Sequence, residues 1–205
     1  MNLIDVLALF LIMVTLAMIP SASVALVVGR SAIAGFAGGA AVVAGIVLGD
    51  FVFLTGAILG MAALAEMMGG LFMAVRILGG GYLIWMGIRL LRSRPENGMR
   101  INSATASSLV AGFMAGLLIT LGDIKAILFY ASLLPVFIDM NSLRAYDIAM
   151  IYLVTLVTVS GVKLIYAYAA QTLVMHSGGT AMGRLAQRAA GGLMMGTGIY
   201  IVVKT

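Results

Sequence analysis

Four charged side chains, Asp50, Asp123, Lys125 and Lys163, stand inside long apolar stretches of this sequence. A charge at the centre of a bilayer costs about 2.5–3.5 kcal/mol on the insertion scale, so such a residue needs a partner, a water-filled cavity, or both. Carboxylates and ammonium groups that converge there are suited to binding the ends of a zwitterion or to relaying a proton. In the alternative interpretation, Asp50 with Lys163 and Asp123 with Lys125 are structural pairs. We favour the first because intramembrane ionisable groups are functional by default.

Two of the apolar stretches are interrupted near their middle. In the first, Pro20 removes a helix hydrogen bond, and Ser21 and Ser23 can satisfy the freed backbone groups or contact a solute. A helix that restarts after Pro20 points its positive N-terminal end at this region, which suits a carboxylate ligand. A kink needed only for packing is the alternative. In the second, Gly122 weakens the helix beside Asp123, and unwound backbone there offers carbonyls and amides to a ligand.

The composition excludes a soluble protein. Hydrophobic residues make up 63% of the 205 residues and charged residues only 9%, whereas a soluble domain has roughly 45–50% and 25%. The apolar stretches are continuous rather than alternating, which predicts transmembrane helices and not barrel strands. The net charge of +5 comes from dispersed basic residues, so it indicates membrane orientation and no nucleic-acid partner. The absence of cysteine excludes disulfides and thiolate metal sites.

The length accommodates about six membrane crossings and no separate soluble domain. The six apolar stretches are Leu3 to Val28, Phe36 to Ala65, Leu71 to Leu91, Leu109 to Phe137, Tyr146 to Val174, and Leu185 to Val203. We therefore expect an all-α membrane protein with one transmembrane domain, residues 1–205. An Arg-rich connector, residues 92–108, separates a first repeat, residues 1–91, from a second, residues 109–205.

The charge distribution predicts the orientation. Cytoplasmic loops carry the excess of Lys and Arg, so we place the connector in the cytoplasm of a multi-pass inner-membrane protein whose N-terminus lies outside. Arg30 then marks the cytoplasmic end of the first span. Two halves of three spans would enter the membrane from opposite sides, which is the inverted-repeat arrangement of secondary transporters. The broken first and fourth helices would then lie near the midplane, and the second span of each half would carry one mid-helix charge, Asp50 or Lys163.

Glycine pairs four residues apart match the spacing that lets helices approach closely. We interpret them as packing within the monomer, with a homodimer interface as the alternative. The pairs are Gly35/Gly39, Gly45/Gly49, Gly56/Gly60, Gly112/Gly116 and Gly192/Gly196.

Enzyme motifs are missing from the sequence. It contains no HExxH zinc pair, no Gly-x-Ser-x-Gly elbow and no P-loop, and its one histidine, His176, is interpreted as a solvated residue. We therefore expect no enzyme activity, no cofactor, no resident metal and no ATP-driven transport by this chain alone.

Three segments carry a resemblance to a known family. Residues 35–50 form a glycine-patterned stretch that ends in Asp50, residues 78–93 end in a basic turn, and residues 112–137 contain Lys125. They resemble the second, third and fourth spans of the lysine exporter and homoserine/threonine resistance superfamily (LysE/RhtB), over nearly the whole chain. The resemblance implies amino-acid export coupled to protons.

The sequence departs from the family pattern at the two interruptions. The family usually has Pro-Gly-Pro-Asn in the first span, where this chain keeps only Pro20 before Ser21, Ala22 and Ser23. In the fourth span the usual Asn-Pro-Lys is replaced by Asp123, Ile124 and Lys125, so the lysine stays, the proline is lost and a carboxylate is added. Lys163 is a further departure. The resemblance therefore does not assign the solute.

Together these features predict a secondary exporter of amino acids or similar small polar metabolites, driven by the proton motive force. The residues that we expect along the path are Asp50, Asp123, Lys125, Lys163, Pro20, Ser21, Ser23 and Gly122. One alternative is an exporter of a metal or other inorganic cation, for which the chain offers mainly hard oxygen ligands. The other is a membrane scaffold subunit that transports nothing and whose charges only pair its helices.

Overall fold

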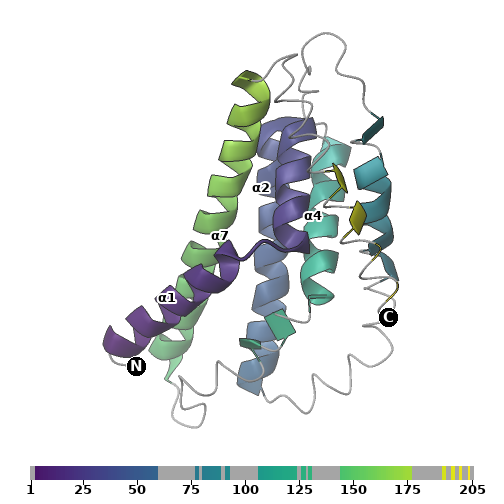
Figure 1. The fold of residues 1–205 in the computed structure, drawn as a ribbon. Coiled ribbons are helices and arrows are strands. Elements are labelled where there is room, and N and C mark those ends of the chain that lie inside the picture. The colour runs from purple at the N-terminus through teal and green to yellow at the C-terminus, as the bar shows by residue number, and fades with distance from the viewer. Residues whose placement is uncertain are drawn as a thin grey trace.

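The computed structural model describes residues 3–59, 77, 78, 80–88, 91, 92, 106–123, 126, 127, 129, 130, 144–176, 191, 192, 195, 196, 199 and 203. Four long helices make up most of this part: α1 (Leu3–Met18), α2 (Ala22–Leu59), α4 (Ala106–Leu121) and α7 (Ala145–His176) (Figure 1). No strand occurs in the residues that the structure describes. The predicted all-helical class is therefore confirmed for them.

The chain leaves the helical conformation between α1 and α2, at Ile19, Pro20 and Ser21. Proline cannot donate the hydrogen bond that would continue α1, and the carbonyls at the end of α1 find other donors. The Leu16 carbonyl accepts from the amide of Ile19 at 3.3 Å, and the Met18 carbonyl accepts from the hydroxyl of Tyr166 at 3.0 Å. The break thus leaves these carbonyls satisfied, as a lipid environment demands.

Gly35 reverses the chain within α2. Its φ of 68° and ψ of −173° lie outside the helical region, in a conformation that favours glycine. A Cβ added to Gly39 would lie 1.9 Å from Oγ of Ser31, eight residues earlier, and in a straight helix eight residues span about 12 Å. Residues 22–34 and 36–59 therefore lie side by side (Figure 1). The helix thus continues past the predicted end of the first span at Val28.

The side-by-side helices have defined relative directions. Residues 36–59 run parallel to α4, because Gly45 lies against Phe113 and Gly49 lies against Thr120. They run antiparallel to α7, because the amide of Phe36 donates to Oε1 of Gln171 at 2.8 Å. At the other end of the same pair of helices, the hydroxyls of Thr55 and Tyr152 are 2.6 Å apart.

Close contact between α2 and α4 depends on glycine. A Cβ on Gly45 would lie 2.0 Å from the carbonyl oxygen of Phe113, and one on Gly116 would lie 2.2 Å from that of Val42. Backbone atoms cannot move aside as a flexible side chain can. The prediction that the glycine pairs pack within the monomer is therefore confirmed for Gly45/Gly49 and Gly112/Gly116.

This packing leads to a stability prediction. The change Gly116→Ala is expected to lower the free energy of unfolding by about 1–3 kcal/mol, the usual cost of overpacking. Gly161→Ala in α7 is the control, since a Cβ there meets no described residue within 4 Å, and alanine should leave stability unchanged or raise it through helix propensity. Thermal unfolding of both purified variants in the same detergent tests the pair. Equal melting temperatures would contradict the close approach.

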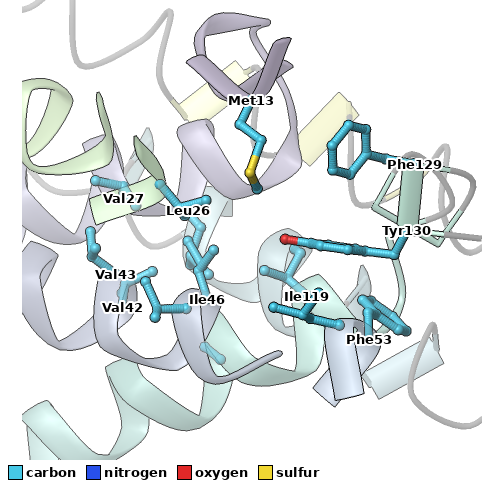
Figure 2. Packing of buried hydrophobic residues seen from close by; sticks show 14 of the residues in the cluster. Met13, Leu26, Val27, Val42, Val43, Ile46, Phe53, Ile119, Phe129 and Tyr130 are labelled. Carbon is cyan, nitrogen blue, oxygen red and sulfur yellow. The ribbon is translucent and has the colours of Figure 1, made fainter. Parts of the chain in front are cut away.

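The helices are apolar on both sides. One buried cluster includes Leu26, Val42, Ile46, Phe53 and Phe129 and joins α1, α2, α4 and the segment after α4 (Figure 2). On the outside of α7, large side chains such as Leu153, Val157 and Ile165 are exposed, with Ile165 at 69%. A helix that is hydrophobic all round fits a membrane environment.

In the part of the chain that the structure describes, two helices are long and apolar enough to cross a membrane, over Ala22–Ile58 in α2 and Ala145–Leu173 in α7. Beyond the reversal at Gly35, residues 36–59 still extend about 36 Å, which exceeds the ~30 Å hydrocarbon core. The apolar segments Leu3–Met18 and Ser108–Leu121 are shorter. Each of these two shorter segments ends at an interruption of the helical chain, after Met18 and after Leu121.

Candidate functional site

A cavity of about 60 Å³ lies at these two interruptions. This volume accommodates a few water molecules or the charged end of a small solute. Its lining comes from α1, α2, α4, the segment after α4, and α7: Met13, Leu16, Ala17, Ser21, Ser23, Ile46, Asp50, Thr120, Asp123, Ala126, Tyr130, Val159 and Lys163.

The mid-helix charges of the second and fifth predicted spans, Asp50 and Lys163, are buried at this cavity. Asp50 is 7% exposed and Lys163 is 4% exposed. Lys163 Nζ donates to Oγ of Ser23 at 2.9 Å, and the Ser23 and Ser21 hydroxyls are 3.0 Å apart. The carboxylate of Asp50 interacts electrostatically with Lys163 and with Asp123. One basic and two acidic side chains, from α2, α7 and the interruption after α4, therefore share the site.

Tyr130 places a hydroxyl beside the buried carboxylate. This hydroxyl hydrogen-bonds to Asp50, and only 3% of Tyr130 is exposed. Figure 2 shows the hydroxyl pointing away from the rings of Phe53 and Phe129, toward Met13 and Ile46. The carboxylate is thereby held at a fixed place in the cavity wall.

Each interruption is followed by a new helical turn that begins at the cavity. The carbonyl of Ser21 accepts from the amide of Ala25 at 2.9 Å, and the carbonyl of Asp123 accepts from the amide of Ile127 at 3.1 Å. Ser21 and Asp123 thus occupy N-cap positions, for which serine and aspartate are preferred. The N-terminal end of a helix carries partial positive charge, so both restarts favour anionic groups.

The cavity brings together five of the residues singled out in the sequence: Asp50, Asp123, Lys163, Ser21 and Ser23. Pro20 and Gly122 lie within the interruptions and are not among the lining residues. Lys125 lies outside the described residues, so the pairing of Asp123 with Lys125 stays a prediction.

Thr120 and Tyr130 also line the cavity, although neither is among the site residues expected from the sequence. Thr120 precedes the second interruption and Tyr130 lies within the segment that resembles the family's fourth span. Their positions beside an interruption were the available signal, but a hydroxyl in an apolar helix is usually bonded to its own backbone.

Arg30 is buried against the start of α4. Its place at a cytoplasmic helix end stays a prediction, and the structure adds that its side chain is only 6% exposed. Its guanidinium donates to the carbonyl of Ser108 and, at 3.1 Å, to the Ser108 hydroxyl. These bonds join the first half of the chain to the start of α4.

The remaining walls are apolar and include Met13, Leu16, Ile46 and Val159. They suit the aliphatic part of a solute. Within the described part of the chain, no group of three His, Cys, Asp or Glu side chains could hold a metal ion.

Comparison with known proteins places the chain in a family. Residues 14–205 match the profile of the family described as LysE type translocator. The chain belongs to this family. It is thus a transporter and not an enzyme, and the resemblance seen in the sequence is confirmed. No solved structure matches this LysE type translocator significantly.

Several curated relatives cover most of this translocator. An uncharacterized membrane protein of Synechocystis sp. is 39% identical over 205 residues, which cover 98% of this chain and 97% of that protein. A leucine efflux protein of Salmonella typhimurium is 30% identical over 163 residues, 80% of this chain and 77% of the relative. A threonine efflux protein of Salmonella typhi is 29% identical over 164 residues, 78% and 79% of the two chains.

Proposed function

We propose that this LysE type translocator is a secondary exporter of amino acids or similar small polar metabolites across the cytoplasmic membrane. The observation that carries the proposal is the cavity in which buried Asp50 and Lys163 meet Asp123 at the two helix restarts. Opposite charges within apolar walls match a zwitterion that carries an aliphatic side chain.

The two ends of such a solute would be recognised by different elements. Its carboxylate suits the ammonium of Lys163 and the helix restart at Ser21, which supply positive charge. Its ammonium suits the carboxylates of Asp50 and Asp123. Apolar residues such as Met13 and Val159 line the space left for the side chain. Two relatives are named leucine efflux protein and threonine efflux protein, which makes leucine and threonine the first solutes to test.

We further propose two inverted repeats, residues 1–91 and 109–205, with the N-terminus outside and the connector 92–108 in the cytoplasm. The parallel course of residues 36–59 and α4 supports this arrangement. Two parallel neighbouring spans need one crossing, or another odd number, between them. The apolar stretch from Leu71 to Leu91 provides one such crossing.

Export would be coupled to the proton motive force through Asp50. The supporting geometry is a buried carboxylate that shares its cavity with a lysine and a tyrosine hydroxyl. A proton taken up on this carboxylate changes the charge that the solute and Lys163 encounter, so solute and proton occupancy become linked.

Transport by the purified protein in proteoliposomes tests this function. We expect efflux of preloaded [³H]leucine or [³H]threonine that a pH gradient accelerates at least severalfold and that an uncoupler reduces to the rate without a gradient. Empty liposomes and protein denatured before reconstitution are the controls. If none of the twenty amino acids is released faster than from empty liposomes, the proposal fails. In that case the inorganic-cation and scaffold alternatives would be tested by cation flux and by co-purification of a larger partner.

A further inference from the structure

Thr120 contributes a buried hydroxyl to the cavity wall. Thr120 is 3% exposed, and its Oγ1 atom has no hydrogen-bond partner among the residues that the structure describes. A buried hydroxyl without a partner is unfavourable, and in native proteins such groups are rare. Because Thr120 lines the cavity, a group inside the cavity can supply the missing bond.

Contacts on two sides fix Thr120 in place. A Cβ added to Gly49 would lie 2.8 Å from both Cβ and Cγ2 of Thr120, so the threonine packs against the backbone of α2 next to Asp50. The carbonyl of Thr120 accepts from the amide of Asp123 at 2.9 Å. Thr120 thus contacts Gly49, which directly precedes Asp50, and its carbonyl is hydrogen-bonded to the backbone of Asp123.

We infer that the hydroxyl of Thr120 accepts a hydrogen bond from the ammonium group of the transported solute, beside Asp50 and Asp123. This inference rests on the proposed function. A primary ammonium group has three N–H donors, and these three residues offer one oxygen group each. The Thr120 side chain would then set the specificity for solutes that carry a free ammonium group.

The charges argue against the opposite orientation. A solute carboxylate near Thr120 would lie close to two acidic side chains, and like charges repel. Positive charge lies elsewhere in the cavity, at Lys163 beside Ser23. The rival interpretation is that a water molecule alone satisfies the hydroxyl.

The change Thr120→Val tests the inference because valine keeps the shape and removes only the hydroxyl. We expect the KM for the transported amino acid, leucine or threonine, to rise about tenfold, as for loss of a hydrogen bond to a charged group. Thermal stability should stay equal or rise, since an unsatisfied buried hydroxyl is removed. Thr158→Val is the matched control. Thr158 is also buried, but its hydroxyl donates to the Val154 carbonyl at 2.6 Å and it does not line the cavity. The KM of the Thr158→Val variant should therefore equal that of the wild type.

Analogues that keep one end of the solute identify the end that Thr120 contacts. For leucine these are 3-methylbutylamine, with the ammonium, and 4-methylpentanoate, with the carboxylate; for threonine they are 1-amino-2-propanol and 3-hydroxybutyrate. In Thr120→Val, inhibition by the amine should weaken about tenfold and inhibition by the carboxylate should not change. If Thr120→Val transports the solute with the KM of the wild type, water alone satisfies the hydroxyl and the inference is overturned. The inference is also overturned if only inhibition by the carboxylate analogue weakens in the variant. A wild type that transports no amino acid would instead refute the proposed function.

Discussion

Replacing Asp50 with asparagine is expected to reduce proton-driven efflux about a hundredfold. The variant keeps the size of the side chain and its capacity to bond Tyr130, but it removes the charge that faces the solute ammonium. Loss of a charged hydrogen bond weakens binding by about 1.5–3 kcal/mol, and loss of the proton carrier removes the acceleration by a pH gradient. Efflux from proteoliposomes, measured with and without the gradient, reports both effects.

The control for this variant is another buried carboxylate. Asp147 is also 7% exposed, but it accepts from the amide of Arg144 at 3.1 Å at the start of α7 and does not line the cavity. Asparagine can accept the same bond, so Asp147→Asn should keep efflux and its response to the gradient. Full, gradient-responsive efflux in Asp50→Asn would remove Asp50 from the mechanism.

The second large effect is expected at Lys163. The change Lys163→Met removes the cation and leaves Asp50 as an uncompensated buried charge, which costs about 3–5 kcal/mol of stability. Efflux should be lost as well, because the solute carboxylate loses its counter-charge. Thermal unfolding and efflux of the same preparation measure the two consequences separately.

The double variant Asp50→Asn with Lys163→Met separates function from structure. Replacing both members of a buried pair by neutral groups is often neutral or stabilising, so the double variant should regain most of the stability that Lys163→Met loses. Its efflux should remain lost if the charges contact solute and proton. Restored efflux together with restored stability would show that Asp50 and Lys163 only neutralise each other.

Much of the fold follows from local sequence. Continuous apolar stretches and their length predict helices that cross a membrane, because a span of that composition has no other way to satisfy its backbone. Pro20 predicts the end of α1, since proline cannot continue the hydrogen-bond ladder. The sixteen-residue stretch from Gly35 to Asp50 carries the glycine pattern of the family. These signals act over a few neighbouring residues, so they can be read without knowledge of the rest of the chain.

The site depended on contacts between distant segments. Asp50 and Lys163 are far apart in the sequence, and whether they share a cavity is decided by how α2, α4 and α7 pack. Arg30 illustrates the same limit, because only the structure shows that the Ser108 carbonyl and hydroxyl let its side chain be buried.

The sequence alone determined a helical membrane protein of the exporter type, the two interruptions and the charges that need an explanation, because the cost of polar groups in lipid is a local property of each segment. Only the tertiary structure decided that Asp50, Asp123, Lys163 and the Ser21–Ser23 pair line one cavity. It also revealed that the Thr120 hydroxyl has no hydrogen-bond partner among the described residues. Whether a hydroxyl finds a partner depends on which helix packs against it, and for Thr120 the close approach at Gly49 sets that packing.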